Sequence, residues 1–139
     1  MGAGIVGSSL AIGLARLGHK VTVVERSTLG PGPESFGIDV RSVAITPASK
    51  EFLASLDLWE ETLAQPYRAM SIWEAHGVAN LDFDAKEMDQ NCLGWIVEAK
   101  KIQLDIWKKL DSESVSKITA SPTGLSILGD GIELEFENE

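Results

Sequence analysis

The clearest indication of a functional site is a group of three glycines near the start of the chain, because their spacing suits phosphate binding. Gly2, Gly4 and Gly7 form the pattern G-x-G-x-x-G. In a dinucleotide-binding βαβ unit, the first glycine permits a tight turn, the second lets the backbone approach a pyrophosphate, and the third lets a helix pack closely on the sheet. The N–H groups and the dipole of that helix then face the phosphates. The pattern predicts a dinucleotide site that includes Gly2, Ala3, Gly4, Ile5, Val6 and Gly7.

An acidic residue at the expected distance supports this interpretation. Apolar residues continue at helical spacing from Leu10 to Leu17, and Gly18 is placed to end that helix. Residues 20–24 then form a short β-branched strand, which ends at Glu25, 23 residues after Gly2. A carboxylate there is placed to bind ribose hydroxyls. The alternative interpretation is that the glycines form an ordinary turn before a packed helix, and that Glu25 is a solvent-exposed residue at the end of a strand.

The element that normally precedes such a motif is a β-strand, and here Met1 stands directly before Gly2. A parallel sheet builds outward from that strand. We therefore expect an α/β fold with a Rossmann-like βαβ domain that is incomplete because its first strand is missing.

Composition narrows the class of protein. The chain has 139 residues, enough for one domain, and its 44% hydrophobic and 24% charged content is ordinary for a globular protein. Twelve basic against 21 acidic residues give a net charge of −9, which argues against nucleic-acid binding. No apolar run approaches the roughly 20 residues of a membrane span. The single Cys92 excludes an internal disulfide and a cysteine-rich metal site, so we expect no metal and a cytoplasmic location.

The remaining elements follow from periodicity and turn residues. Residues 27–39 are rich in glycine and proline, and they are either a flexible connector or a mobile loop beside a cofactor. A strand at 40–45 leads to a helix with Thr46 as N-cap and Pro47 in its first turn. A short helical piece from Leu58 ends before Pro66.

The second half is predicted to alternate between strands and one helix. A β-rich insert spans about 67–98, with a turn at His76 and Gly77. Residues 99–110 form a helix. Three short strands over 115–136 form a C-terminal β-meander, and its last turn lies at Gly129 to Gly131.

Several of these segments together resemble the group A flavoprotein aromatic hydroxylases. The resemblance rests first on residues 2–26 and on the segment 39–45, which contains Arg41. The segments Met-Ser-Ile-Trp-Glu-Ala at 70–75 and Leu-Gly-Trp-Ile-Val-Glu at 93–98 are similar to the ubiquinone-biosynthesis hydroxylases. The resemblance covers nearly the whole chain.

The resemblance implies an FAD-dependent monooxygenase that uses NAD(P)H and O2 to hydroxylate a polyprenyl phenol or quinol ring. The glycine loop would hold the FAD pyrophosphate, Glu25 would hold the adenosine ribose, and Arg41 would lie along the FAD. Arg26, next to Glu25, is a further cofactor-binding candidate. The family usually has a polar residue where Ala99 stands, so Gln103, one helical turn later, becomes a candidate flavin contact. No side chain is assigned as a catalytic acid or base. Association with the inner membrane surface, with a ubiquinone-biosynthesis complex or with a second copy of the chain stays open.

Two features of that family are not found before Glu139. They are an Asp-Gly fingerprint after a β-hairpin and a later Gly-Asp motif; Asp130 and Gly131 form only a turn. We therefore expect residues 1–139 to be a partial FAD-binding domain, the N-terminal part of a hydroxylase, that is inactive alone. Two alternatives stay open because Glu25 suits the ribose of FAD or NAD. One is a nucleotide-binding module without catalysis, and the other is a different Rossmann oxidoreductase.

Overall fold

A computed structural model describes residues 1–27 and 41–136 of the chain. By its contacts the chain divides into two compact units. The first unit comprises Met1–Pro33 with Gln103–Glu139, and the second comprises Glu34–Ile102. Most of the glycine- and proline-rich segment at 27–39 lies outside the described residues.

The first unit begins with the predicted helix, α1, which runs from Ile5 to Arg16. Gly18 ends it in the left-handed conformation (φ 88°), where its N–H bonds to the Ala15 carbonyl at 2.9 Å. A glycine is needed there because other residues are strained at positive φ. The buried face of the helix consists of Ser8, Ser9, Ala11 and Ile12.

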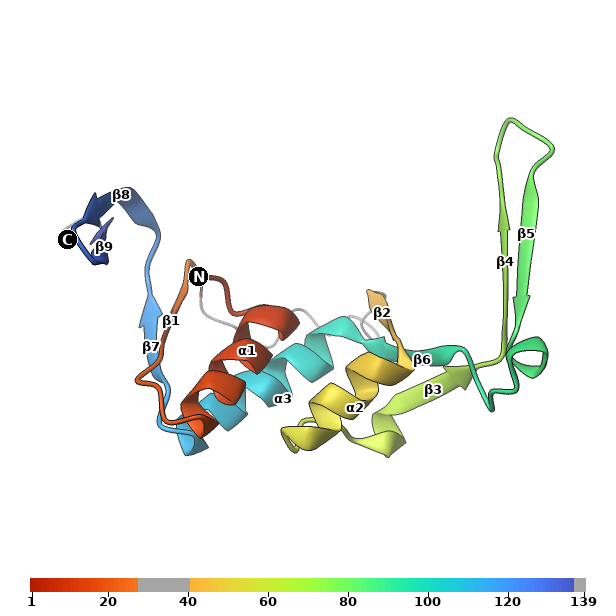
Figure 1. Ribbon diagram of the computed structural model, residues 1–139, viewed down its shortest axis with the longest axis horizontal. Coiled ribbons are helices and arrows are strands. Elements are labelled where there is room, and N and C mark those ends of the chain that lie inside the picture. Colours follow the sequence, from red (N-terminus) through yellow and green to blue (C-terminus); the bar gives the residue numbers. More distant parts are fainter. Residues whose placement is uncertain (28–40, 137–139) are drawn as a thin grey trace, which may run out of the picture. The chain divides into compact units, whose positions relative to one another are not determined.

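A two-stranded parallel sheet follows in the same unit. Strand β1 (Thr22–Glu25) pairs with β7 (Ser116–Thr119), and Glu25 lies opposite Thr119 (Figure 1). Helix α3 (Ala99–Ser112) leads into β7, and the boundary between the units falls within it, before Gln103. The buried apolar residues of this unit include Ile12, Val23, Val24, Ile106, Leu110 and Val115.

The C-terminal strands correct one prediction. A single meander was predicted for 115–136, but β7 pairs with β1, and only β8 (Pro122–Leu128) and β9 (Gly131–Phe136) form a hairpin. The physical reason is that a strand reached through a helix can return parallel to an earlier strand, whereas short turns give antiparallel pairs. The Gly129–Asp130 turn makes the predicted connection between β8 and β9.

The second unit is built on an antiparallel sheet of order β2-β6-β3. The strands are β2 (Ser42–Ile45), β6 (Gly94–Glu98) and β3 (Ala64–Tyr67). Pro66 lies within β3, a strand that was not predicted; an edge strand tolerates proline because one side needs no N–H donor. The short helical piece expected before it is a single 3-10 turn, Glu61–Leu63.

The other elements of the second unit match the predicted pattern. Helix α2 (Pro47–Ser55) has Thr46 as its N-cap, and the Thr46 hydroxyl accepts from the Ser49 N–H at 3.3 Å. Strands β4 (Ala69–Trp73) and β5 (Asn80–Asp84) form an antiparallel hairpin whose connection includes His76 and Gly77 (Figure 1). A 3-10 turn, Ala85–Met88, follows β5.

Candidate nucleotide-binding site

The loop before α1 is shorter than the glycine pattern suggested. Residues 2–7 were predicted to form the loop, but the helix already begins at Ile5, with Gly4 as N-cap. The backbone N–H of Gly2 donates to the Val24 carbonyl at 2.8 Å, which holds the loop against β1. Among the described residues, no side chain caps α1 and its first turn contains no acidic residue. The N–H groups at this end therefore have no competing carboxylate from their own turn.

The three glycines are required for different reasons. Gly2 has φ 87°, a conformation that a side chain strains. A Cβ on Gly7 would collide with the carbonyl oxygen of Gly2. Gly4 has an ordinary extended conformation (φ −66°), and a Cβ there would meet no described atom within 4 Å. Folding explains the first and third glycines, whereas Gly4 borders open space, as the approach of a ligand to the backbone would require.

Glu25 lies at the end of β1, on the side of the loop, as predicted. Its Oε2 accepts the N–H of Ala3 at 2.7 Å, and its Oε1 accepts the N–H of Arg26 at 2.9 Å. The Ala3 N–H holds the pKa of the Glu25 carboxyl below its usual value; partial burial opposes this, and the N–H groups of Ser27 and Arg26 add to it. The side chain is therefore a carboxylate at neutral pH, with lone pairs left to accept further donors.

Gln103 reaches the same loop from α3. Its Nε2 donates to the carbonyl oxygen of Ala3 at 3.1 Å. The sequence predicted a contact with flavin for this residue and missed the contact with the loop. No local signal reveals that contact, because 100 residues separate Gln103 from Ala3.

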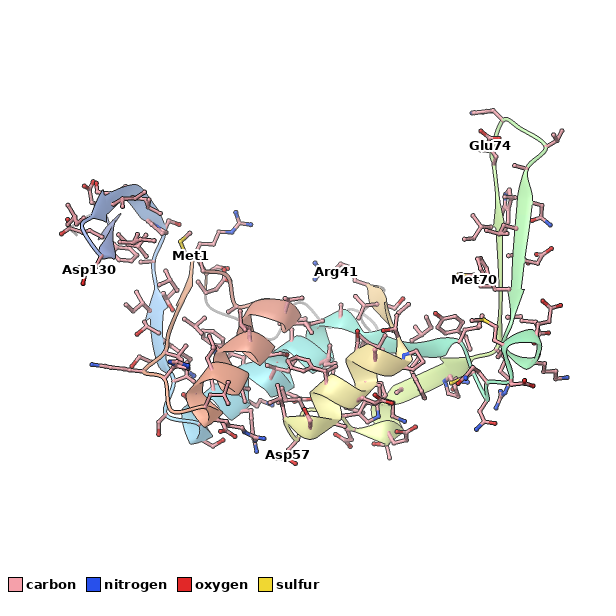
Figure 2. The ribbon with its side chains drawn as sticks, in the orientation of Figure 1. Met1, Arg41, Asp57, Met70, Glu74 and Asp130 are labelled. Atoms are coloured by element: carbon pink, nitrogen blue, oxygen red, sulfur yellow. The ribbon has the colours of Figure 1, made fainter. Side chains whose placement is uncertain are left out.

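The first unit therefore brings together the loop residues 2–4, the first helical residues 5–7, Glu25, Arg26 and Gln103. Arg26 is exposed directly after β1. Arg41 belongs to the second unit, where it precedes β2 and its carbonyl accepts the Ala99 N–H at 3.0 Å (Figure 2). Its predicted position along the cofactor stays a prediction.

The site and fold agree with the family to which the sequence belongs. The family model of the FAD dependent oxidoreductases matches residues 1–131, so the chain is a member of that family. The residues that line the loop also fit a dinucleotide, because they offer unobstructed helix N–H groups, an open Cα at Gly4 and an ionised carboxylate at Glu25.

Two curated relatives are similar over most of the chain. The 3-demethoxyubiquinol 3-hydroxylase of Escherichia coli is 37% identical over 115 residues, which are 81% of this chain and 29% of that protein. The ubiquinone hydroxylase UbiM of Neisseria meningitidis is 30% identical over 125 residues, or 83% of this chain and 27% of that protein. The chain thus spans less than a third of the length of these relatives.

Solved structures share the fold. A flavoprotein/dehydrogenase from Cytophaga hutchinsonii matches 99% of this chain and 33% of its own, with a TM-score of 0.68 and 18% identity. The peptidyl tryptophan dihydroxylase QhpG matches 98% of this chain and 27% of its own, with a TM-score of 0.58 and 20% identity. None of the described helices is long and apolar enough to cross a bilayer.

Proposed function

We propose that this chain provides the FAD-binding part of a monooxygenase that hydroxylates the ring of a polyprenyl phenol or quinol in ubiquinone biosynthesis. Membership of the FAD-dependent oxidoreductase family supports the cofactor, and similarity to two proteins named as ubiquinone-related hydroxylases supports the substrate class. NAD(P)H and O2 as co-substrates, and association with the inner membrane surface, belong to the same proposal.

The observation that carries the proposal is the open space beside Gly4. No described contact and no positive φ requires a glycine at this position, yet the glycine lies at the N-terminus of α1. A negatively charged group that approaches there would meet backbone N–H groups and the positive end of the helix dipole. A pyrophosphate is the ligand whose size and charge suit this arrangement.

The other residues of the site have complementary roles in the proposal. Glu25 would accept hydrogen bonds from the ribose hydroxyls while it holds Ala3. Bound FAD would supply the redox chemistry, and the protein would supply binding, orientation and exclusion of water. We assign no acid or base to the described residues, and we expect the chain alone to bind nucleotide without hydroxylating a substrate.

The test is an equilibrium titration of the 139-residue chain with FAD and, separately, with ADP. Gly4→Ala should weaken both by at least about tenfold, because its methyl group occupies the space through which the phosphates approach. Gly13→Ala is the matched control, since Gly13 also has open space around it and lies within α1. Its affinity should equal that of the wild type.

The outcomes separate the alternatives. Equal affinity of the wild type and Gly4→Ala for ADP would contradict a pyrophosphate site at this loop. Tight binding of NAD with no preference for FAD would favour a different Rossmann oxidoreductase. Hydroxylation of a phenolic substrate by the chain alone, with FAD and NADPH added, would contradict the expectation that it only binds nucleotide.

A further inference from the structure

Both polar groups of Ala3, the residue between the first two glycines, are held by side chains from distant parts of the first unit. Its N–H donates to Glu25 at the end of β1, at 2.7 Å. Its carbonyl accepts the Nε2 of Gln103 on α3, at 3.1 Å. Ala3 is fully buried, so neither group has water as an alternative partner.

The first of these bonds fixes the peptide between Gly2 and Ala3. The described peptide bonds are trans, and in a planar trans peptide the N–H and C=O point in opposite directions. Because the Ala3 N–H points to Glu25, the Gly2 carbonyl must point away from Glu25. It lies against the Cα of Gly7, which is the contact that leaves no room for a Cβ there.

The second bond fixes the next peptide in the same way. Because the Ala3 carbonyl points to Gln103, the N–H of Gly4 must point away from Gln103. Within the described residues this N–H has no hydrogen-bond partner. It therefore stands as a free donor beside the open space at Gly4, next to the first-turn amides of α1.

We propose that Gln103 is a positioning residue, which holds the Ala3 carbonyl so that the Gly4 N–H faces an anionic group at the N-terminus of α1. This inference rests on the proposed function, because it assigns the donor that binds the pyrophosphate. A glutamine suits the task, since its amide donates a hydrogen bond without adding a charge beside the phosphates. Holding the peptide before binding reduces the ordering cost of the loop.

The experiment uses the isotopically labelled 139-residue chain and two variants that lack a donor at neutral pH. Gln103→Met keeps a long unbranched side chain with good helix propensity, and Gln103→Glu keeps the size and shape. Gln90→Met, at an exposed position, is the control. Two signals are followed by NMR, namely the Ala3 carbonyl carbon without nucleotide and the Gly4 amide during titration with ADP.

Both Gln103 variants should shift the Ala3 carbonyl signal, lose the ADP-induced shift of the Gly4 amide and bind ADP about tenfold more weakly. The amides of Val6 and Gly7 should still respond to ADP at saturation, which general unfolding would not allow. Gln90→Met should behave as the wild type.

The two failures are distinguishable. A wild-type chain that binds no ADP overturns the proposed function and the ligand role of Gly4. An unchanged Ala3 carbonyl signal in both Gln103 variants, or a wild-type Gly4 response to ADP in both, overturns the positioning role of Gln103 even if ADP binds.

Discussion

Replacing Glu25 by glutamine should destabilise the first unit and weaken nucleotide binding together. The carboxylate accepts the N–H groups of Ala3 at 2.7 Å and Arg26 at 2.9 Å. Glutamine has one acceptor oxygen, and its amide N–H groups would face one of these donors. Ala3 is fully buried, so an unpaired N–H there costs about 1–3 kcal/mol. We expect a loss of about 2 kcal/mol in the free energy of unfolding.

The pH dependence gives this prediction a direction. The pKa of Glu25 is lowered on folding, chiefly by the Ala3 N–H, so the unfolded chain takes up its proton first as the pH falls. The stabilisation by this carboxylate is fully present above the unfolded value, 4.5, and is lost as the pH falls through the lower folded value. Glu25→Gln should remove this part of the acid dependence.

The assay is urea unfolding followed by circular dichroism, at pH 7 and at steps down to about pH 3. Glu51→Gln, at an exposed position on α2, is the control and should leave the unfolding curve unchanged. ADP affinity should fall at least about tenfold in Glu25→Gln, which corresponds to one lost charge-assisted bond to ribose. A variant as stable as the wild type at pH 7, with the same acid dependence, would refute the role of Glu25 in holding the loop.

Three further substitutions test the packing around the site and the core of the second unit. Gly7→Ala should lower the free energy of unfolding by about 1–3 kcal/mol because its Cβ collides with the Gly2 carbonyl. The control Gly13→Ala should raise it by about 0.5–1 kcal/mol, and equal denaturation midpoints for the two variants would contradict the collision. Ser8→Ala should raise the free energy of unfolding by about 1 kcal/mol, since the buried Ser8 hydroxyl has no partner among the described residues. Ser9→Ala instead loses a 2.7 Å hydrogen bond to the Ile5 carbonyl, and a larger gain from Ser9→Ala than from Ser8→Ala in urea unfolding would contradict this reasoning. Lys50→Met should lower the free energy of unfolding by about 1 kcal/mol, and by less in high salt, because the Lys50 ammonium lies 4.2 Å from the Trp95 ring centre and 2.9 Å from a Glu61 oxygen. The control Lys101→Met, at an exposed position, should not change thermal unfolding, and identical melting of the two variants would show that the contacts of Lys50 do not stabilise the unit.

Local sequence signals predicted the elements that depend on neighbouring residues. The glycine at position 18 ends α1, Thr46 caps α2, and the turn at Gly129–Asp130 joins β8 to β9, because these effects act within one turn of chain. The position of Glu25 beside the loop was also predictable, since a strand of fixed length follows a helix of fixed length.

Long-range pairing was not predictable in the same way. Strand β7 was predicted as a short strand of the same kind as β8 and β9, and its pairing with the distant strand β1 distinguishes it from them. Proline is disfavoured within strands, and the edge position that permits Pro66 in β3 is a property of the assembled sheet. The bond from Gln103 to Ala3 depends on the packing of α3 against the loop, which no spacing in the sequence encodes.

The most direct test of the account is a crystal structure of the chain with ADP. We predict that the diphosphate lies at the N-terminus of α1, with its oxygens roughly 2.7–3.2 Å from the backbone nitrogens of Gly4 and the first helical turn. We also predict that the ribose hydroxyls reach the Glu25 carboxylate. A diphosphate bound elsewhere on the chain, with the Gly4 N–H left without a ligand, would contradict the central claim that this loop is the dinucleotide site.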